Sequence, residues 1–366
     1  MPLKCGIVGL PNVGKSTLFN ALTNAGALMA NYPFATKDPN VGVIAVPDPR
    51  LDELARLVQP QKVVPTSVHI VDIAGLIKGA SKGEGLGNQF LSHIREVDAI
   101  LHVVRCFDDP NITHVEGSVD PVRDVEIIDF ELLMKDIETV SKRIEKLRKS
   151  AKSGDKTEKQ KLQIAQQLLD HLNRGHKARS FQRTSELAVD LLKEMSLLTD
   201  KKVLYVCNVD ENSVTTGNAY TRALQAYIQS QDAEMVILAG EIEAELAALD
   251  DPDDKRAFLK EMGLSEPGVY QLIRKAYHLL DLLTFFTAGE KEVRAWTVPR
   301  GATAYDAAGV IHSDFQRGFI RAEVISYSDF ISYGSEHAVR QAGKLRSEGR
   351  DYVVQDGDII HFLFNV

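Results

Sequence analysis

The sequence predicts an α/β protein built on a mainly parallel sheet, with helices on both of its faces. Strand-like runs recur well apart, and helical patterns lie between several of them, as expected of parallel strands joined by helical crossovers. A pair of heptad-patterned helices interrupts this series, and a β-rich segment follows it. The strand-like runs are Lys4–Val8, Val68–Asp72, Ala99–Arg105, Val203–Asn208 and Glu234–Leu238.

The first run leads into residues 9–16, which read GLPNVGKS and match the phosphate-binding pattern G-x-x-x-x-G-K-S. A helix-like run, Thr17–Leu22, follows, so the pattern stands in the strand–loop–helix setting in which it binds phosphates. The glycines let backbone N–H groups turn toward the phosphates, and the helix N-terminus adds partial positive charge. The alternative is a glycine-rich turn that binds nothing, which the complete motif disfavours. We expect a nucleoside triphosphate to bind at Asn12, Val13, Gly14, Lys15, Ser16 and Thr17.

Length and composition indicate a soluble protein of several domains. At 366 residues the chain is long enough for two or three domains, and its net charge of −8 argues against a general nucleic-acid coat. No apolar run approaches a membrane-spanning length, and the early phosphate loop leaves no room for a signal peptide. We therefore expect a cytoplasmic protein with no membrane partner. Its cysteines lie in apolar runs and are expected to be buried thiols: Cys5, Cys106 and Cys207.

Between the third and fourth runs, the pattern predicts an antiparallel hairpin of two coiled-coil helices. Apolar residues alternate spacings of four and three from Leu133 to Leu147 and from Leu162 to Leu172, with a polar tip between them. The arms are too short for a long two-chain coiled coil, so we expect pairing within the chain and a monomer. Residues 131–180 hold thirteen Lys or Arg against seven Asp or Glu. These charges either solvate a thin hairpin or form a basic surface for RNA.

From about Asp281 the chain changes to short β-like pieces separated by turns. A helix-like stretch at Ala304–His312 separates the first two pieces, which predicts a small β-rich module. We therefore expect three parts. They are a phosphate-loop domain, a helical insertion and a C-terminal module, over residues 1–130 with 200–280, 131–199 and 281–366, respectively.

Two loops after the phosphate loop carry candidate magnesium ligands. Asp72 and Gly75 form a D-x-x-G pattern, in which the carboxylate holds a water ligand of Mg²⁺ and the glycine N–H contacts the γ-phosphate. Thr36 stands in a loop after the first helix and offers a hydroxyl in addition to that of Ser16. We expect Ser16, Thr36 and Asp72 at the metal, with Lys15 and Gly75 at the reacting phosphate.

Several segments together resemble the YchF subfamily of Obg-like ATPases, and the resemblance extends over essentially the whole chain. They are residues 9–16, 31–36, 72–76, 79–87 and 294–297. The C-terminal module resembles a TGS domain, a ubiquitin-like β-grasp fold, through Gly318–Val324 and Gln355–Asp358. The resemblance implies a P-loop NTPase with an Obg-type G domain, which hydrolyses ATP and binds ribosomes or RNA.

The segment expected to read the base departs from the guanine-specific pattern N-K-x-D. Residues 208–211 read NVDE, so Glu replaces the Asp whose carboxylate accepts two hydrogen bonds from guanine. Asp210 lies one residue before the position that the Asp has in this pattern, and we expect its side chain on the other side of the chain. Backbone groups of Val209 with the Asn208 side chain suit adenine, whereas an unpaired guanine donor costs about 1–3 kcal/mol. We expect Asn208, Val209 and Glu211 at the base and ATP rather than GTP; a GTPase of loose specificity is the alternative.

The residue that orients the attacking water in many switch GTPases is here Leu76, which can neither donate nor accept a hydrogen bond. We therefore expect slow intrinsic turnover. The resemblance points to His114, in the loop Asp108–Val125, as a group that orients water or meets developing charge. A surface histidine without a role is the alternative. The resemblance also places Asn12 where potassium-dependent relatives hold K⁺ beside the phosphates.

Three classes of function are compatible with these features. The favoured one is an ATP-hydrolysing switch, whose nucleotide state alters how the hairpin and the C-terminal module hold ribosomes or RNA. A P-loop kinase of small molecules is disfavoured, because its acceptor pocket normally occupies a lid and this chain has a heptad hairpin instead. A scaffold that binds ATP without cycling differs from the switch in showing no multiple turnover.

Overall fold

Six strands form the main sheet: β1 (Lys4–Val8), β2 (Val41–Ala45), β4 (Ser67–Asp72), β5 (Ala99–Arg105), β6 (Lys202–Asn208) and β7 (Glu234–Leu238). Their order is β2-β4-β1-β5-β6-β7, and β2 is antiparallel to β4 while the other pairs are parallel. The computed structural model describes residues 4–29, 40–73, 86–153, 155–231 and 233–365. The mainly parallel sheet is confirmed. Strand β2 was not predicted, because a glycine within a five-residue run weakens the strand signal.

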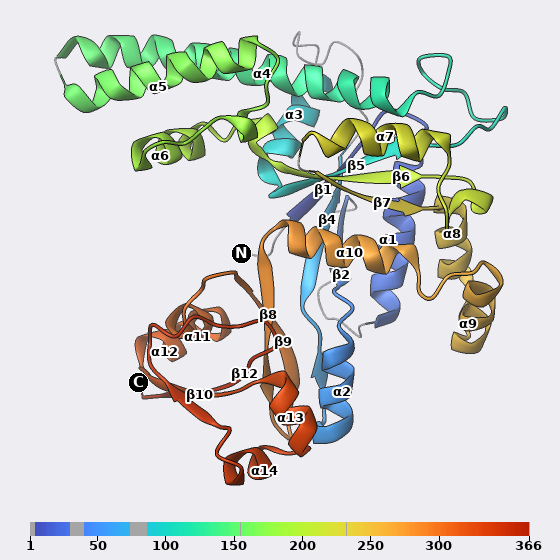
Figure 1. Ribbon diagram of the computed structural model, residues 1–366, viewed down its shortest axis with the longest axis vertical. Helices are drawn as coiled ribbons and strands as arrows, with labels where there is room; N and C mark the ends of the chain where they lie inside the picture. The colour runs from blue at the N-terminus through green and yellow to red at the C-terminus, as the bar shows by residue number, and fades with distance from the viewer. Residues whose placement is uncertain (1–3, 30–39, 74–85, 154, 232, 366) are drawn as a thin grey trace.

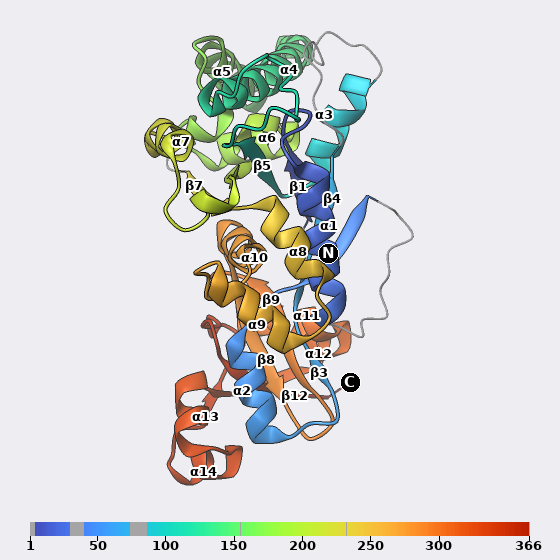
Figure 2. The same cartoon turned by 90° about the vertical axis from the view of Figure 1, so that its right-hand side faces the viewer.

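Helices cover both faces of this sheet (Figures 1 and 2). One face carries α1 (Lys15–Met29), α8 (Gly240–Ala248) and α10 (Gly268–Leu279), and α9 (Pro252–Glu261) follows α8. The other face carries α3 (Leu86–Glu96), α4 (Pro121–Ser150) and α7 (Ala219–Gln229). None of the described helices combines the length and apolarity that a membrane crossing requires.

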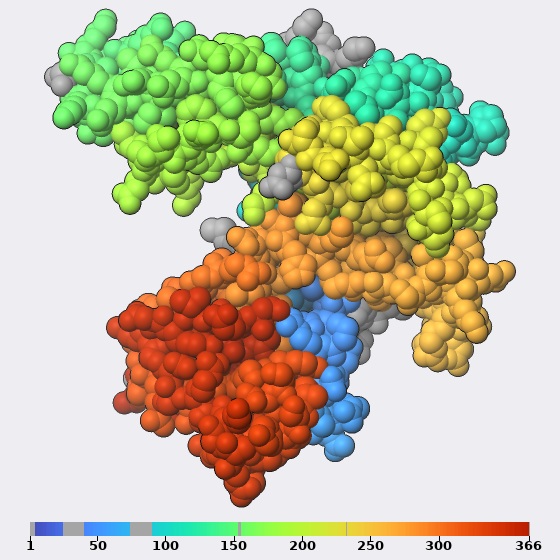
Figure 3. Space-filling model, in the orientation of Figure 1, coloured from blue at the N-terminus to red at the C-terminus, as the bar shows by residue number. Residues whose placement is uncertain are grey.

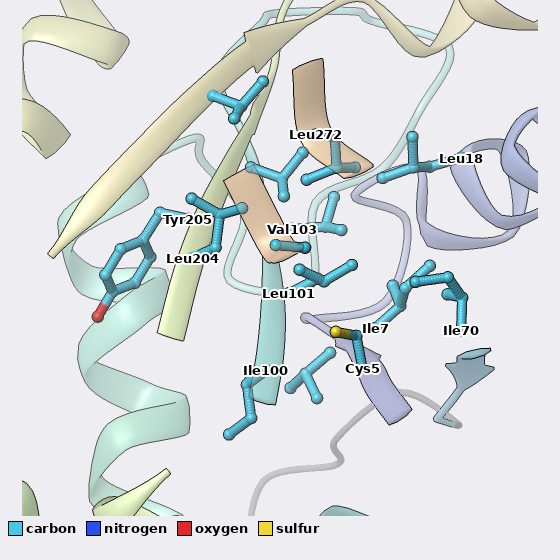
Figure 4. Close-up of a cluster of buried hydrophobic side chains, with 14 of the residues drawn as sticks. Cys5, Ile7, Leu18, Ile70, Ile100, Leu101, Val103, Leu204, Tyr205 and Leu272 are labelled. Atoms are coloured by element: carbon cyan, nitrogen blue, oxygen red, sulfur yellow. The ribbon is translucent and has the colours of Figure 1, made fainter. Parts of the chain in front are cut away.

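The core between these layers consists of aliphatic side chains from adjacent parallel strands. Figure 4 shows Leu101 and Val103 of β5 near Leu18 of α1 and Leu272 of α10, and all four are at most 1% exposed. Such continuous apolar runs are expected where a parallel strand is buried on both faces. The three cysteines lie in this domain, each buried with a free thiol, as expected.

The helical hairpin consists of α4 and α5 (Lys156–Asn173), and α6 (Glu186–Met195) returns the chain toward β6. Helix α4 is longer than predicted, because Asp120 accepts a hydrogen bond from the Arg123 N–H and Pro121 begins the helix. Its first half packs on the sheet core, and its second half packs on α5. The expected loop Asp108–Val125 therefore ends at residue 120.

The C-terminal module is a mixed sheet in the order β11-β10-β12-β8-β9-β3, with α11 packed on it. Its strands β8 and β9 form an antiparallel hairpin, and the central β12 runs parallel to β8, which is the arrangement of a β-grasp fold. This confirms the expected fold of the module. Its elements are β8 (Leu282–Ala288), β9 (Val293–Pro299), α11 (Ala304–Ile311), α12 (Ser313–Arg317), β10 (Phe319–Ile325), α13 (Tyr327–Tyr333), α14 (Glu336–Gln341), β11 (Arg346–Glu348) and β12 (Ile359–Phe364).

Residues 48–64, which we assigned to the phosphate-loop domain, pack on this module instead. Strand β3 (Val63–Val64) pairs with β9, and α2 (Pro49–Val58) buries Leu51 and Leu54 in the same apolar cluster as Phe286. The Arg50 guanidinium also contacts the Asp356 carboxylate at 2.7 Å. This segment lies between β2 and β4, so the sheet domain and the module are tied by two stretches of chain. Contacts so distant in sequence leave no local pattern.

Candidate functional site

A cavity of about 500 Å³ lies beyond the carboxyl ends of β1, β5 and β6, where the ligand of a parallel sheet is expected. Its walls come from four segments that are far apart in sequence. The lining residues fall within the ranges 12–17, 107–112, 208–210 and 240–241. The structure thus brings the phosphate loop together with the segment that we expected to read the base.

The phosphate loop depends on its glycines because other backbones and side chains approach them closely. Gly14 has a φ of 96°, and a Cβ there would lie 2.3 Å from the Asn208 side-chain nitrogen. A Cβ on Gly9 would lie 2.5 Å from the Val103 carbonyl oxygen. Asn12 also has a positive φ, 62°, and lines the cavity. A side chain in place of either glycine would therefore clash with these neighbours.

Lys15 carries a partly desolvated positive charge at the base of this loop. Its side chain is largely buried, and its Nζ donates to the Leu10 carbonyl oxygen at 2.7 Å. Burial lowers the pKa of Lys15 to about 8, while the nearby Asp72 carboxylate acts in the opposite direction. Burial likewise raises the pKa of Asp72, and Lys15 opposes that shift. A cation that has lost part of its hydration gains from an incoming phosphate.

Candidate metal ligands lie at the same edge of the sheet. Ser16 is exposed at the N-terminus of α1 and lines the cavity, and so does Thr17. Asp72 ends β4, which pairs with β1 directly before the phosphate loop. A hydroxyl and a carboxylate are oxygen donors of the kind that Mg²⁺ prefers, so these residues fit that ion. Thr36 and Gly75 lie outside the described residues.

The Asn208 side chain makes a hydrogen bond within the protein through each of its two polar atoms. Its amide nitrogen donates to the Val13 carbonyl oxygen at 3.0 Å, and its oxygen accepts from the Gly240 N–H at 2.8 Å. The Val209 N–H donates to the Leu238 carbonyl oxygen, because the β6–β7 pairing continues past the strand end. Asn208 also lines the cavity, and our expectation that it contacts adenine stays a prediction. Asn208 braces the phosphate loop against the start of α8, and Val209 lines the cavity.

The two acidic residues that follow lie differently from our expectation. Asp210, which we placed on the other side of the chain, lines the cavity, and its carboxylate accepts from the Ser213 hydroxyl at 3.0 Å. Glu211 begins a short 3-10 turn, is exposed and does not belong to the described lining of the cavity. The carboxylate at the fourth position of the guanine-reading pattern is thus absent from the described wall.

The loop at 107–112 is organised by a buried arginine that sequence analysis missed. Arg105 is 1% exposed, and its guanidinium donates to the carbonyl oxygens of Phe107, Asp109 and Ile112. The Asn12 side chain donates to the Thr113 carbonyl oxygen at 3.1 Å and so joins this loop to the phosphate loop. The available signal was an arginine at the end of a strand whose only other polar residue is His102.

Comparison with known proteins identifies the family. A family model described as a 50S ribosome-binding GTPase matches residues 4–209, and one described as YchF-GTPase_C, of unknown function, matches residues 282–365. The "Ribosome-binding ATPase YchF" of Bacillus subtilis (strain 168) is 54% identical over 368 residues, which is all of both chains. The protein of that name from Escherichia coli O157:H7 is 51% identical over 366 residues, again all of both chains. The chain belongs to the YchF family.

Solved structures agree with this assignment. The Schizosaccharomyces pombe structure titled "YchF GTPase" superposes with a TM-score of 0.89 at 40% identity and covers 99% of this chain and 97% of that chain. A GTP-binding protein from Pyrococcus horikoshii OT3 superposes with a TM-score of 0.62 at 22% identity, over 99% of this chain and 100% of that chain. The second likeness shows the fold alone. The YchF fold therefore extends over the sheet domain, the hairpin and the C-terminal module.

In this YchF chain, His114 is neither a surface residue nor part of the described cavity wall. It is 7% exposed, and its Nε2 lies 2.8 Å from an oxygen of the Asp124 carboxylate in α4. Its Nδ1 accepts from the Glu116 N–H at 3.1 Å, so Nε2 carries the proton and donates to Asp124. Both ring nitrogens are thus engaged. His114 anchors the loop after Ile112 to the start of α4.

Proposed function

We propose that this chain hydrolyses ATP and binds the ribosome. The observation that carries the proposal is the cavity at the carboxyl edge of the sheet, where a complete phosphate loop and the 208–210 segment meet. The full-length similarity to proteins named "Ribosome-binding ATPase YchF" supports the same conclusion. The geometry is that of a site in which the protein positions the phosphates and compensates their charge, which is most of what phosphoryl transfer requires.

Each part of the phosphate loop has a distinct task in this proposal. The backbone N–H groups around Gly14 hold the phosphates, and the Lys15 ammonium stabilises the negative charge that grows on the leaving and transferred groups. The Ser16 hydroxyl and the Asp72 carboxylate would hold Mg²⁺, together with Thr36. When bound, that ion neutralises phosphate charge. Gly75 would contact the γ-phosphate through its N–H.

The choice of ATP over GTP belongs to this proposal, because the names of the relatives disagree about the nucleotide. The bacterial relatives are named ATPases, whereas the Schizosaccharomyces pombe structure is titled a GTPase. Preference for ATP is supported by the position of Glu211, which is exposed and away from the described wall. In this proposal, the Val209 carbonyl oxygen accepts from the adenine amino group, where guanine presents an oxygen.

Intrinsic turnover should be slow, because neither Leu76 nor the engaged ring of His114 offers a free group to orient water. If His114 acts, it must first leave Asp124, and ribosome binding is the event that we propose for this release. The test is His114→Ala with and without ribosomes. A loss of stimulation with little change in the basal rate supports the proposal, and unchanged turnover in both conditions rejects it.

A potassium ion is the second group that we propose to compensate phosphate charge. The Asn12 side chain is exposed at the cavity and donates through its nitrogen to Thr113, which leaves its oxygen available for a cation. Turnover should therefore be higher in K⁺ than in Na⁺, and Asn12→Ala should remove the difference. Equal rates in the two salts would remove this part of the proposal.

The hairpin tip is the surface that we propose for ribosomal RNA. Six exposed cations there form no ion pair within the described residues, while the cations nearer the sheet mostly contact carboxylates. The tip cations are Lys146, Arg148, Lys149, Lys152, Lys156 and Lys159. Figure 3 shows the hairpin and the C-terminal module projecting to the same side with open space between them. We also propose that the protein is monomeric and cytoplasmic.

The experiment that tests the function is steady-state turnover of ATP and of GTP, with and without purified ribosomes, in potassium buffer with Mg²⁺. The proposal predicts multiple turnovers of ATP that ribosomes accelerate. Binding of ATP without turnover would favour a scaffold, and equal use of both nucleotides would favour a GTPase of loose specificity. Co-sedimentation of ribosomes with a variant in which the six tip cations are replaced by Gln tests the docking surface, and binding should also fall steeply with salt.

A further inference from the structure

A second cavity lies at the amino-terminal ends of β6 and β7, at the opposite edge of the sheet from the phosphate loop. It has a volume of about 790 Å³. Its walls come from the connection after α5, the first residues of β6, the end of α7 with the following turn, and Leu279 at the end of α10. The two cavities share no lining residue, so this one is not an extension of the nucleotide site.

Three cationic side chains line this cavity: Lys177, Arg179 and Lys202. Only the first is neutralised by a described carboxylate, since the Lys177 ammonium contacts Asp129 at 2.5 Å and Gln231 at 2.6 Å. Within the described part of the chain, Arg179 and Lys202 form no ion pair, and no lining residue is acidic. Asp232, which follows one lining residue, lies outside that part. The described part of the cavity wall therefore carries excess positive charge, in a protein whose net charge is −8.

The protein fixes the position of the Arg179 side chain, but the described residues do not supply an acceptor for each of its hydrogen-bond donors. One of its terminal nitrogens donates to the Lys201 carbonyl oxygen at 3.1 Å, and the other is buried without an acceptor among the described residues. The buried hydroxyl of Tyr205 lies beside this guanidinium; burial raises the pKa of that hydroxyl, and Arg179 opposes the shift. Burial lowers the pKa of Lys177, Asp129 opposes the shift, and Arg179 lowers it further. Such a pair of close cations is stabilised by an anion placed between them.

We propose that this cavity binds a small phosphorylated molecule. Its phosphate would accept hydrogen bonds from the planar guanidinium of Arg179 and from the ammonium of Lys202, as phosphates do at arginine-containing sites. The rest of the molecule would lie against Tyr227 and Leu279, which also line the cavity. The volume is within the range of small-molecule sites. A nucleic-acid backbone is disfavoured, because it needs cations on an open surface and the Lys177 side chain is only 16% exposed.

Calorimetry with ribose 5-phosphate as the probe tests this proposal. The full-length protein is first saturated with Mg²⁺ and a non-hydrolysable ATP analogue, so that the phosphate loop is occupied. We expect one saturable site with a Kd of about 1 mM or tighter, and no binding of ribose without the phosphate. Arg179→Gln should weaken the probe at least about tenfold, since it removes charge-assisted hydrogen bonds. Lys202→Gln, at an exposed position, should weaken it about threefold.

The matched control is Arg183→Gln, because Arg183 belongs to the same connection but pairs with Asp200 outside the cavity. It should bind the probe as the unchanged protein does. Melting temperatures of all three variants separate a lost ligand contact from lost folding, and Lys202→Gln keeps the test informative if Arg179→Gln unfolds. The proposal is overturned if ribose 5-phosphate does not bind, if Arg183→Gln weakens it as much as Arg179→Gln, or if only a short single-stranded RNA responds to these variants.

Discussion

The two edges of the main sheet carry two cavities that are built in different ways. At the carboxyl edge, backbone atoms and fully engaged side chains fix the walls, through Gly14, Asn208 and Arg105. At the amino edge, long cations from separate segments supply the walls, and Arg179 and Lys202 lack ion-pair partners among the described residues. The walls of the first cavity are held by contacts within the protein, whereas the second has charge that a ligand would compensate. Preorganisation of this kind is what catalysis of phosphoryl transfer needs, and simple binding needs less of it.

The most direct test of this comparison is Lys15, the cation that the proposed reaction uses at the carboxyl edge. Lys15→Ala should lower ATP turnover at least about 100-fold, because it removes a preorganised cation from the developing phosphate charge. Turnover is measured by phosphate release at saturating ATP. Arg183→Gln, far from this cavity, serves as the control and should keep the original rate. A Lys15→Ala variant that turns over normally would show that the loop is not the reacting site.

The buried Arg105 tests whether the carboxyl edge depends on its internal hydrogen bonds. Arg105→Leu should lower the free energy of unfolding by about 3 kcal/mol, because three carbonyl oxygens lose their donor. The KM for ATP should rise as well, since the loop 107–112 forms one wall. Denaturant unfolding and steady-state kinetics check the two effects. A smaller loss of stability than that caused by Arg179→Gln would reverse the contrast between the edges.

Asn208 tests the same contrast with a neutral side chain. Asn208→Ala leaves the Val13 carbonyl oxygen and the Gly240 N–H without their partner, so stability should fall by about 2 kcal/mol. Asn208→Asp keeps the acceptor for Gly240 but turns the contact with Val13 into a repulsion, and it should fall between Asn208→Ala and the unchanged protein. If the alanine variant changed only the choice between ATP and GTP and not the stability, our reading of Asn208 as a brace would fail.

The smallest predicted effect concerns the hydrogen bonds between α8 and the start of α10. Helix α10 ends at Leu279, which lines the second cavity. The buried Glu243 carboxylate accepts from the N–H groups of Gly268 and Val269 at the start of α10, and burial raises its pKa to about 7 from 4.5. A raised pKa favours the protonated form in the fold. Its stabilising contribution is therefore complete below pH 4.5 and is lost as the pH rises through about 7.

Between pH 6 and pH 8, this loss should amount to about 1 kcal/mol. Unfolding measured at both pH values gives the difference, and Glu243→Gln, which cannot titrate, should reduce it. An identical pH dependence in the variant would assign the effect to other groups.

Sequence alone predicted the features that local patterns encode. The parallel strands, the hairpin and the phosphate loop each depend on residues that are adjacent or regularly spaced. Contacts between distant segments were not predictable in this way. The packing of residues 48–64 on the C-terminal module, the brace formed by Asn208 and the engagement of His114 by Asp124 all join residues from separate elements.

The part of the cavity that we expect to bind the nucleotide base shows most clearly what could not be predicted from the sequence. The departure from N-K-x-D was visible in the sequence, but the side of the chain on which Asp210 and Glu211 lie was not, because a 3-10 turn sets their directions. The basic cavity at the amino edge left no sequence signal, since its cations come from positions 177, 179 and 202 in unrelated local patterns.

A competition between ATP and GTP for the free protein tests the central claim most directly, namely that the carboxyl-edge cavity accepts adenine. With Mg²⁺ and K⁺ present, we expect ATP to bind about tenfold more tightly, the ratio that corresponds to one unpaired guanine donor. Lys15→Ala should weaken both nucleotides, which places the competition at this cavity. Binding of GTP as tight as or tighter than that of ATP would contradict the account.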